Sequence, residues 1–187
     1  MNIDVKLSPI LCAYTSTTMI EHETVKKTLL PMIDSHPFDG SNPTIKKVDW
    51  HSSTHFDRPW INYIKPIIEN YMVVMGSALG YQNPTITDLW FQQYTEGDFH
   101  EWHVHGQQMV GVYYLELPDD APRTELVSPF LHKDKFIPDV KEGDILIFPS
   151  IIVHRAPVVG TTRKTILSWN FNFERPNKNT VSIMDNL

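Results

Sequence analysis

Apolar and polar residues follow different periods in the two halves of this 187-residue sequence. In the first half the spacing is helical, most clearly from Asp57 to Leu79, where apolar side chains recur every three or four residues. Asp57 can cap this helix, and Pro59 suits its first turn. A second helix is predicted for Thr17 to Ile33, and Pro31 should end or kink it.

From Thr85 onward the pattern is that of β-strands, with short β-prone runs separated by Pro, Gly, Asp and Asn. Asn2 to Ala13 also alternates loosely and is interpreted as an edge strand. The predicted strands of the second half are Ile86–Thr95, Met109–Leu117, Thr124–Val127, Asp144–Phe148, Ile151–His154 and Lys164–Phe173. Many short strands after a helical part favour a β-sandwich or jelly-roll barrel with helices on one face.

The composition is that of an ordinary globular protein of one domain, with 41% apolar and 20% charged residues. A net charge of −6 without a dense basic tract argues against general nucleic-acid binding. Cys12 is the single cysteine, which favours an intracellular, cytoplasmic setting. We find no signal peptide and no apolar run near the roughly 20 residues of a membrane helix, so no membrane association is expected.

We expect a single domain over residues 1–187. Within it, residues 1–84 form an N-terminal helical support, residues 85–175 form the jelly-roll core and residues 176–187 form a polar tail. The sequence leaves the oligomeric state open, with a homodimer as one option.

Three histidines, His100, His103 and His105, lie within six residues just before a β-prone run. Residues two apart on a strand point to the same face, so His103 and His105 can present both imidazoles to one point. A metal with open coordination positions needs such a pair and at least one more ligand. His154, which closes a predicted strand, is the candidate, although a hydrogen-bonded core histidine is the alternative interpretation.

Alternation in the last strand places Arg163 on the face that carries Leu167, Trp169 and Phe171, and Lys164 on the other face. The first face is the more apolar and should point inward, which would set Arg163 at the rim of a cavity. A guanidinium in that position suits a carboxylate held by two parallel hydrogen bonds. The alternatives are a structural ion pair with Asp or Glu, or a side chain that extends into solvent.

In combination these features resemble the iron(II)- and 2-oxoglutarate-dependent oxygenases, especially the prolyl-hydroxylase-like branch. In that family a tyrosine-containing strand precedes H-x-D, an I-Y-Y-L-like strand follows, and a G-x-L-L-x-F strand leads to a distal histidine and then an arginine. The resemblance covers roughly Leu89 to Phe173. The counterparts are Tyr94, His103-Val104-His105, Val112–Leu115, Gly143–Phe148, His154 and Arg163.

The resemblance implies a mostly β fold with flanking helices, built as a double-stranded β-helix barrel. It implies a dioxygenase that uses Fe(II), 2-oxoglutarate and O2 to hydroxylate a protein side chain, a nucleobase or a small metabolite. His103, His105 and His154 would be the metal ligands and the catalytic centre. Arg163, with Tyr114 or Tyr94, would bind the distal carboxylate of 2-oxoglutarate.

The sequence departs from the family at one ligand, because His105 stands where the family has aspartate. Either three histidines bind the metal, or Glu101 or Asp98 supplies a carboxylate, or the site is inactive. We favour three histidines, because the motif resembles uncharacterised bacterial and phage members with H-x-H followed by G-V-Y-Y. His100 is then expected on the substrate side, where changing it should mainly alter turnover.

Two other classes compete with the oxygenase. A cupin-type metal-binding barrel enzyme also has H-x-H and a distal histidine, but Ile151 stands where the second cupin motif has glycine. A cupin would also have no use for Arg163. The other class is a non-catalytic barrel used for binding or assembly, which predicts neither stoichiometric iron nor turnover of 2-oxoglutarate.

Overall fold

The structure is a computed structural model that describes residues 6–7, 15–37, 42–127 and 135–176. Two helices, α1 (His22–Asp34) and α2 (Pro59–Ala78), and a short 3-10 helix, η1 (Trp50–Ser52), accompany two antiparallel sheets. The strands of the large sheet are β1 (Lys6–Leu7), β2 (Thr15–Thr18), β3 (Lys47–Val48), β4 (Tyr81–Tyr94), β6 (Met109–Glu116), β9 (Asp144–Pro149) and β11 (Lys164–Pro176). The strands of the small sheet are β5 (His100–His103), β7 (Glu125–Val127), β8 (Lys135–Phe136) and β10 (Val153–Ala156).

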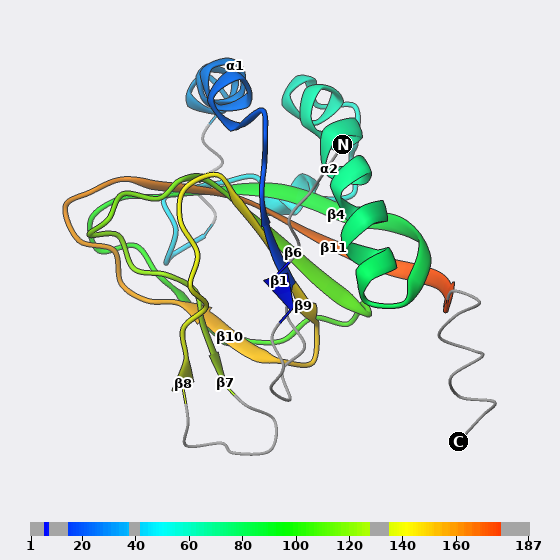
Figure 1. Cartoon of the computed structure of the whole chain (residues 1–187). Helices are drawn as coiled ribbons and strands as arrows, with labels where there is room; N and C mark the ends of the chain where they lie inside the picture. Colours follow the sequence, from blue (N-terminus) through cyan, green and yellow to red (C-terminus); the bar gives the residue numbers. More distant parts are fainter. Residues whose placement is uncertain (1–5, 8–14, 38–41, 128–134, 177–187) are drawn as a thin grey trace.

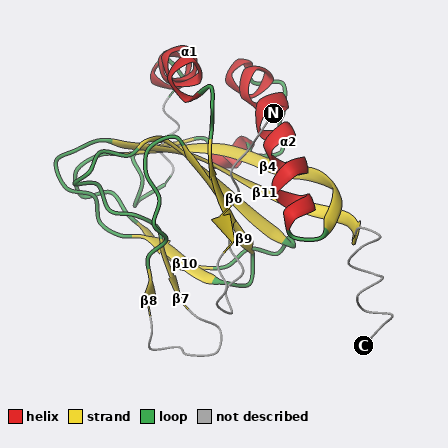
Figure 2. Cartoon of the chain, in the orientation of Figure 1, coloured by secondary structure: helices red, strands yellow, loops and turns green. Residues whose placement is uncertain are grey.

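The two sheets and the helices form three layers. The large sheet has the order β1-β2-β9-β6-β11-β4-β3, and the small sheet has the order β5-β10-β7-β8. Both α-helices lie over one face of the large sheet, and the small sheet lies on the other side (Figure 1). More residues lie in strands than in helices, and the long helices are confined to that one side (Figure 2).

The mostly β architecture with flanking helices is confirmed, and each strand predicted after Thr85 is present. The N-terminal part is less purely helical than predicted, because β1, β2 and β3 extend the large sheet at its two edges. Thr15 to Thr18 pairs with β9, so the first helix begins later than expected, at His22. A run of β-branched residues favours that strand. Pro31 does not end α1, which continues to Asp34.

Some sequence-based predictions concern parts of the chain outside the described residues. They include the polar tail from residue 177 onward and most of the predicted Asn2–Ala13 strand. Within the described ranges, no helix combines the length and the apolar character that a membrane crossing requires.

The large sheet is buried on both faces, and this determines where the candidate site lies. On one face, Leu167 and Trp169 of β11 pack in a cluster with apolar residues of the helices. On the other face, Ile166 of β11 and Val112 of β6 pack in a second cluster between the sheets. The predicted metal-binding residues belong to the space between the sheets.

Gly111 on β6 should not tolerate a side chain. A Cβ at this position would overlap the indole ring of Trp169, which is fully buried and cannot move aside without disturbing the helix-side core. We expect Gly111→Ala to reduce the free energy of unfolding by at least about 1–3 kcal/mol, the usual cost of overpacking. Urea unfolding measures this, and Gly160→Ala, which enters open space, is the control. Equal midpoints for the two variants would contradict the prediction.

Candidate metal centre

Three histidines converge between the sheets, two from the strands β5 and β10 and one from the loop after β5. His103 ends β5 and pairs in the sheet with His154 of β10. His105 follows two residues later, and its backbone N–H donates to the carbonyl of Ser150 at 3.1 Å. One ring nitrogen from each histidine lies within 4.8 Å of the others, a grouping that can bind a single metal ion. The convergence predicted from the sequence is therefore present.

Hydrogen bonds orient two of these imidazoles for metal binding. Nδ1 of His103 lies 2.7 Å from the carbonyl oxygen of Glu101, and Nδ1 of His154 lies 2.8 Å from that of Ile152. A carbonyl only accepts, so each Nδ1 carries the proton and each Nε2 presents a lone pair. This arrangement is the usual support of metal-bound histidine.

The protonation states also suit a metal. Burial lowers the pKa of His103. Burial also lowers the pKa of His154 to about 3 and that of His105 to about 4, and at these two residues the neighbouring imidazoles lower the pKa further. All three side chains are therefore neutral at physiological pH, which is the form that binds a metal. Neutral imidazoles suit divalent first-row ions such as Fe(II), so the donor set fits the predicted metal.

Neither carboxylate proposed as an alternative ligand belongs to this group. The carboxylate of Asp98 accepts hydrogen bonds from the N–H and hydroxyl of Thr95, at 2.9 and 3.1 Å, and lies 3.6 Å from Lys46 Nζ. Glu101 is exposed, and its contact with His103 is through the main chain. The geometry therefore favours the three-histidine interpretation.

His100 lies beside the group without belonging to it. Its ring stacks on that of His103 with centroids 3.9 Å apart, and its Nδ1 lies 3.2 Å from Gln92 Nε2. Burial, with a smaller effect of the neighbouring histidines, lowers its pKa to about 3. His100 is therefore a neutral group next to the candidate metal centre.

A cavity of about 310 Å³ opens onto the histidines. Its volume is in the range of small-ligand sites. The lining residues are Asn42, Trp50, Ser53, Asp88, Trp90, Gln92, His100, His103, His105 and Asn170. A narrower space of about 30 Å³ continues inward past His154 toward Tyr94 and Ile166.

No family model and no curated protein matches the sequence, but solved structures match the fold. Three of them have TM-scores of 0.60 to 0.65 and cover 84–90% of this chain. The viral collagen prolyl hydroxylase of Paramecium Bursaria Chlorella virus-1, as a 2-oxoglutarate complex, has a TM-score of 0.60 at 14% identity, over 84% of this chain and 94% of its own. The fold is that of the 2-oxoglutarate- and iron(II)-dependent oxygenases.

Two further structures with the oxygenase fold differ in what they bind. A prolyl hydroxylase from Trichoplax adhaerens, in complex with a hypoxia inducible factor peptide fragment, has a TM-score of 0.63 at 17% identity, over 84% of this chain and 83% of its own. HygX from Streptomyces hygroscopicus, with nickel and 2-oxoglutarate bound, has a TM-score of 0.65 at 7% identity, over 90% of this chain and 84% of its own.

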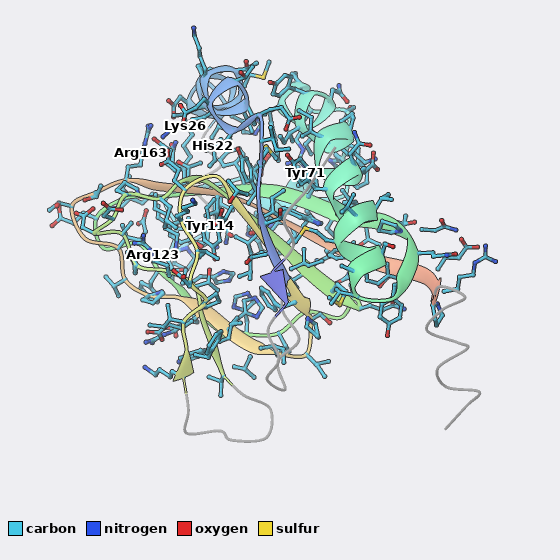
Figure 3. The ribbon with its side chains drawn as sticks, viewed as in Figure 1. His22, Lys26, Tyr71, Tyr114, Arg123 and Arg163 are labelled. Carbon is cyan, nitrogen blue, oxygen red and sulfur yellow. The ribbon has the colours of Figure 1, made fainter. Side chains whose placement is uncertain are left out.

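Within the oxygenase fold, Arg163 does not face the cavity, and the prediction that it does is wrong. Its Nη1 lies 3.1 Å from Asp34 Oδ1, and its Nη2 lies 2.8 Å from Glu116 Oε1. Figure 3 shows Arg163 on the helix side of the large sheet, near Lys26. Its strand face is apolar because it packs against the helices, so the structural ion pair is the interpretation that the geometry supports.

Lys164, which alternation places on the face opposite to Arg163, points between the sheets. It is 0% exposed, its Nζ donates to the carbonyl of Pro122 at 2.7 Å, and it lies 5.5 Å from the centroid of the Tyr94 ring. Burial, with a smaller effect of Arg123, lowers its pKa to about 7. A lysine this deeply buried is rare. The signal in the sequence that could have identified it is that Lys164 is the one charged residue of the predicted Lys164–Phe173 strand.

The two predicted tyrosines lie on the same inner side as Lys164. Tyr94 and Tyr114 are fully buried, and the hydroxyl of Tyr114 donates to Thr124 Oγ1 at 2.8 Å. Burial is the main cause that raises the pKa of each phenol, so both remain neutral donors. In Figure 3, Tyr114 and Arg123 lie on the side of the large sheet opposite to Arg163.

Proposed function

We propose that the protein is an Fe(II)- and 2-oxoglutarate-dependent dioxygenase that hydroxylates an organic substrate. The observation that carries this proposal is the convergence of His103, His105 and His154, as neutral imidazoles, within the oxygenase fold. Solved structures of that fold hold 2-oxoglutarate or nickel with 2-oxoglutarate, which supports the same cofactors here. When bound with 2-oxoglutarate and O2, iron(II) supplies the chemistry that turns C–H into C–OH while 2-oxoglutarate becomes succinate and CO2.

On this proposal the two sheets correspond to the double-stranded β-helix, and residues 1–187 act as one oxygenase domain in the cytoplasm. The main-chain carbonyls that accept from His103 and His154 keep the metal-binding nitrogens directed at one point. Trp90 stacks beside His105, with centroids 5.9 Å apart, and Phe148 packs edge-on against His154 at 4.8 Å. Both rings place apolar surface beside the imidazoles that would bind the metal.

We further propose that Lys164 takes the role first given to Arg163 and pairs with the distal carboxylate of 2-oxoglutarate. Its Nζ lies between Tyr94 and the carbonyl of Pro122, on the inner side of the centre. The inner space of about 30 Å³ holds little more than water, so binding requires surrounding side chains to shift. Lys164 would then exchange the Pro122 carbonyl for a carboxylate, a stronger partner for an ammonium.

Anaerobic titration with Fe(II) and 2-oxoglutarate, followed by visible absorption, tests the proposed function. We expect a metal-to-ligand charge-transfer band that saturates at one equivalent, and no band when succinate, which lacks the keto group, replaces 2-oxoglutarate. Bound iron without the band would contradict the oxygenase and support a cupin-like site. Absence of stoichiometric iron binding would support the non-catalytic barrel.

A further inference from the structure

The 310 Å³ cavity has a negative side. Among the described residues that line it, Asp88 of β4 supplies the one carboxylate, and neither lysine nor arginine contributes. The other lining side chains are histidines, amides, a serine and two tryptophans. The groups that contact the Asp88 carboxylate are neutral, so they do not cancel its charge.

The contacts of Asp88 are uneven between its two oxygens. Oδ2 accepts from Thr87 Oγ1 at 2.8 Å and from Gln107 Nε2 and Asn170 Nδ2, each at 3.3 Å. Oδ1 has a single long contact, at 3.4 Å, with Ser53 Oγ. Because each carboxylate oxygen accepts about two hydrogen bonds, Oδ1 keeps capacity for a donor from a ligand.

Asn170 adds a second acceptor beside Asp88. Its amide nitrogen donates to Asp88, which fixes the orientation of the amide and turns Oδ1 away from the carboxylate. That Oδ1 has no hydrogen-bond partner among the described residues, and the side chain is 7% exposed. Beside Asp88 the polar atom without a partner is an acceptor, so an anion at this place would be repelled and an apolar group would leave the acceptor unpaired.

Aromatic rings complete the cavity. Trp50 is 46% exposed, and the centroid of its ring lies 4.2 Å from that of the His51 ring. Trp90 lies on β4 between Asp88 and Gln92 in sequence, and all three side chains share one face of that strand. Indole faces attract cations. We infer that this cavity binds an organic cation, an ammonium or guanidinium group of the substrate, with Asp88 as its counter-ion and Trp50 and Trp90 as its walls. His103 and His105 line the same cavity, so a carbon next to the cationic group would lie near the metal centre.

The inference rests on the proposed function at one point, namely that iron(II) at the three histidines would act on a carbon next to the cationic group. Asp88 is not one of the residues grouped for the metal, so its carboxylate is available to a substrate.

The test is the binding of small probes of equal size and different charge. n-Butylammonium and n-butylguanidinium are titrated against n-butanol and butyrate, and the indole N–H signals of ¹⁵N-labelled protein report binding. The cations should bind at least about tenfold more tightly than butanol, because they combine a charge-assisted hydrogen bond with indole contacts, and butyrate should bind most weakly. Equal affinities for butylammonium and butanol would overturn the inference.

Three variants locate the effect. Asp88→Asn keeps the shape and should bring the affinities for butylammonium and butanol to within about twofold of each other. Asp119→Asn, at an exposed turn, removes the same charge elsewhere and should leave the difference intact. Trp50→Leu changes an exposed ring and should weaken cation binding by about threefold or more without affecting folding, even if Asp88→Asn is unstable. A preference for cations that persists in Asp88→Asn and in Trp50→Leu would overturn the assignment.

The inference and the proposed function can fail separately, because the probes are titrated both with and without Fe(II) and 2-oxoglutarate. A charge-transfer band without Asp88-dependent cation binding leaves the oxygenase and overturns the inference. Asp88-dependent cation binding without the charge-transfer band supports the inference and contradicts the proposed oxygenase. Comparing butylammonium with a Gly-Gly-Lys-Gly-Gly peptide distinguishes the source of the cation. Tighter binding of the peptide indicates a protein side chain, and equal binding indicates a small amine. Both results support the inference.

Discussion

Loss of iron binding is the expected result of replacing His154 with alanine. His154 is buried, and the carbonyl of Ile152 holds its Nδ1, so its Nε2 is one of three nitrogens that define the centre. Removing even a supporting partner of a metal ligand typically costs about 10- to 100-fold in metal affinity, so removing the ligand itself should cost at least about 100-fold. Anaerobic equilibration with Fe(II), followed by gel filtration and iron analysis, measures the retained metal.

Two further variants make this result specific. His100→Ala removes a ring that stacks on His103 but lies outside the group, so iron affinity should stay within about tenfold of the original. His105→Asp restores the carboxylate of the family's H-x-D motif and should retain iron, because a carboxylate also binds Fe(II). Iron retained by His154→Ala, with unchanged unfolding behaviour, would show that the three histidines do not form the metal site.

The elements of the large sheet could be predicted from sequence because their local patterns are strong. β4, β6 and β11 are long β-prone runs bounded by turn residues, and α2 has a full apolar stripe. The convergence of His103 with His154 is different, since it depends on the pairing of β5 with β10 across about fifty residues of chain. Spacing alone could not predict that pairing, and the family resemblance supplied it.

The error at Arg163 has a physical cause in the same sheet. A strand with one buried face shows which side points inward, but β11 is buried on both faces, against helices on one and the small sheet on the other. The larger apolar side chains, Leu167 and Trp169, lie on the helix side, so choosing the more apolar face selected the wrong side of the strand.

Asp88 was missed for a related reason. Asp88, Trp90, Gln92 and Tyr94 alternate on β4 and share the inner face, where Asp88, Trp90 and Gln92 line the cavity. Two of these four side chains, Asp88 and Gln92, are polar, and a strand face of such mixed composition is normally expected to face solvent. A polar face on a strand that is otherwise deeply buried is the signal of an internal site, and it becomes visible only when the covering sheet is known.

Lys164→Met should weaken 2-oxoglutarate binding by about 10- to 100-fold, because the lost charge-assisted hydrogen bond contributes roughly 1.5–3 kcal/mol. Lys164 is the fully buried cation on the inner face of β11, and methionine is similar to it in length without the charge. Iron affinity should change by less than about twofold, since Lys164 is not one of the three grouped residues. Titration of the charge-transfer band at fixed Fe(II) gives the 2-oxoglutarate affinity.

Arg163→Met is the matched control, one residue away on the opposite face. It breaks ion pairs with Asp34 and Glu116 that are partly exposed, so it should cost about 0–1 kcal/mol of stability and leave 2-oxoglutarate affinity unchanged. The reverse outcome, with Arg163→Met impaired and Lys164→Met normal, would restore the original assignment and contradict the strand orientation described above.

The pH dependence of 2-oxoglutarate binding provides an independent check on Lys164. In the free protein, burial lowers its pKa to about 7, so the ammonium is present below pH 7 and is lost as the pH rises. The dianion binds the charged form, so above pH 7 binding must take up a proton, and affinity should fall by about tenfold per pH unit until the pKa of the complex is reached. Lys164→Arg keeps its charge throughout this range, so its affinity, even if weaker, should not depend on pH between 7 and 9. A wild-type affinity that is flat over the same range would show that Lys164 does not contact the cosubstrate.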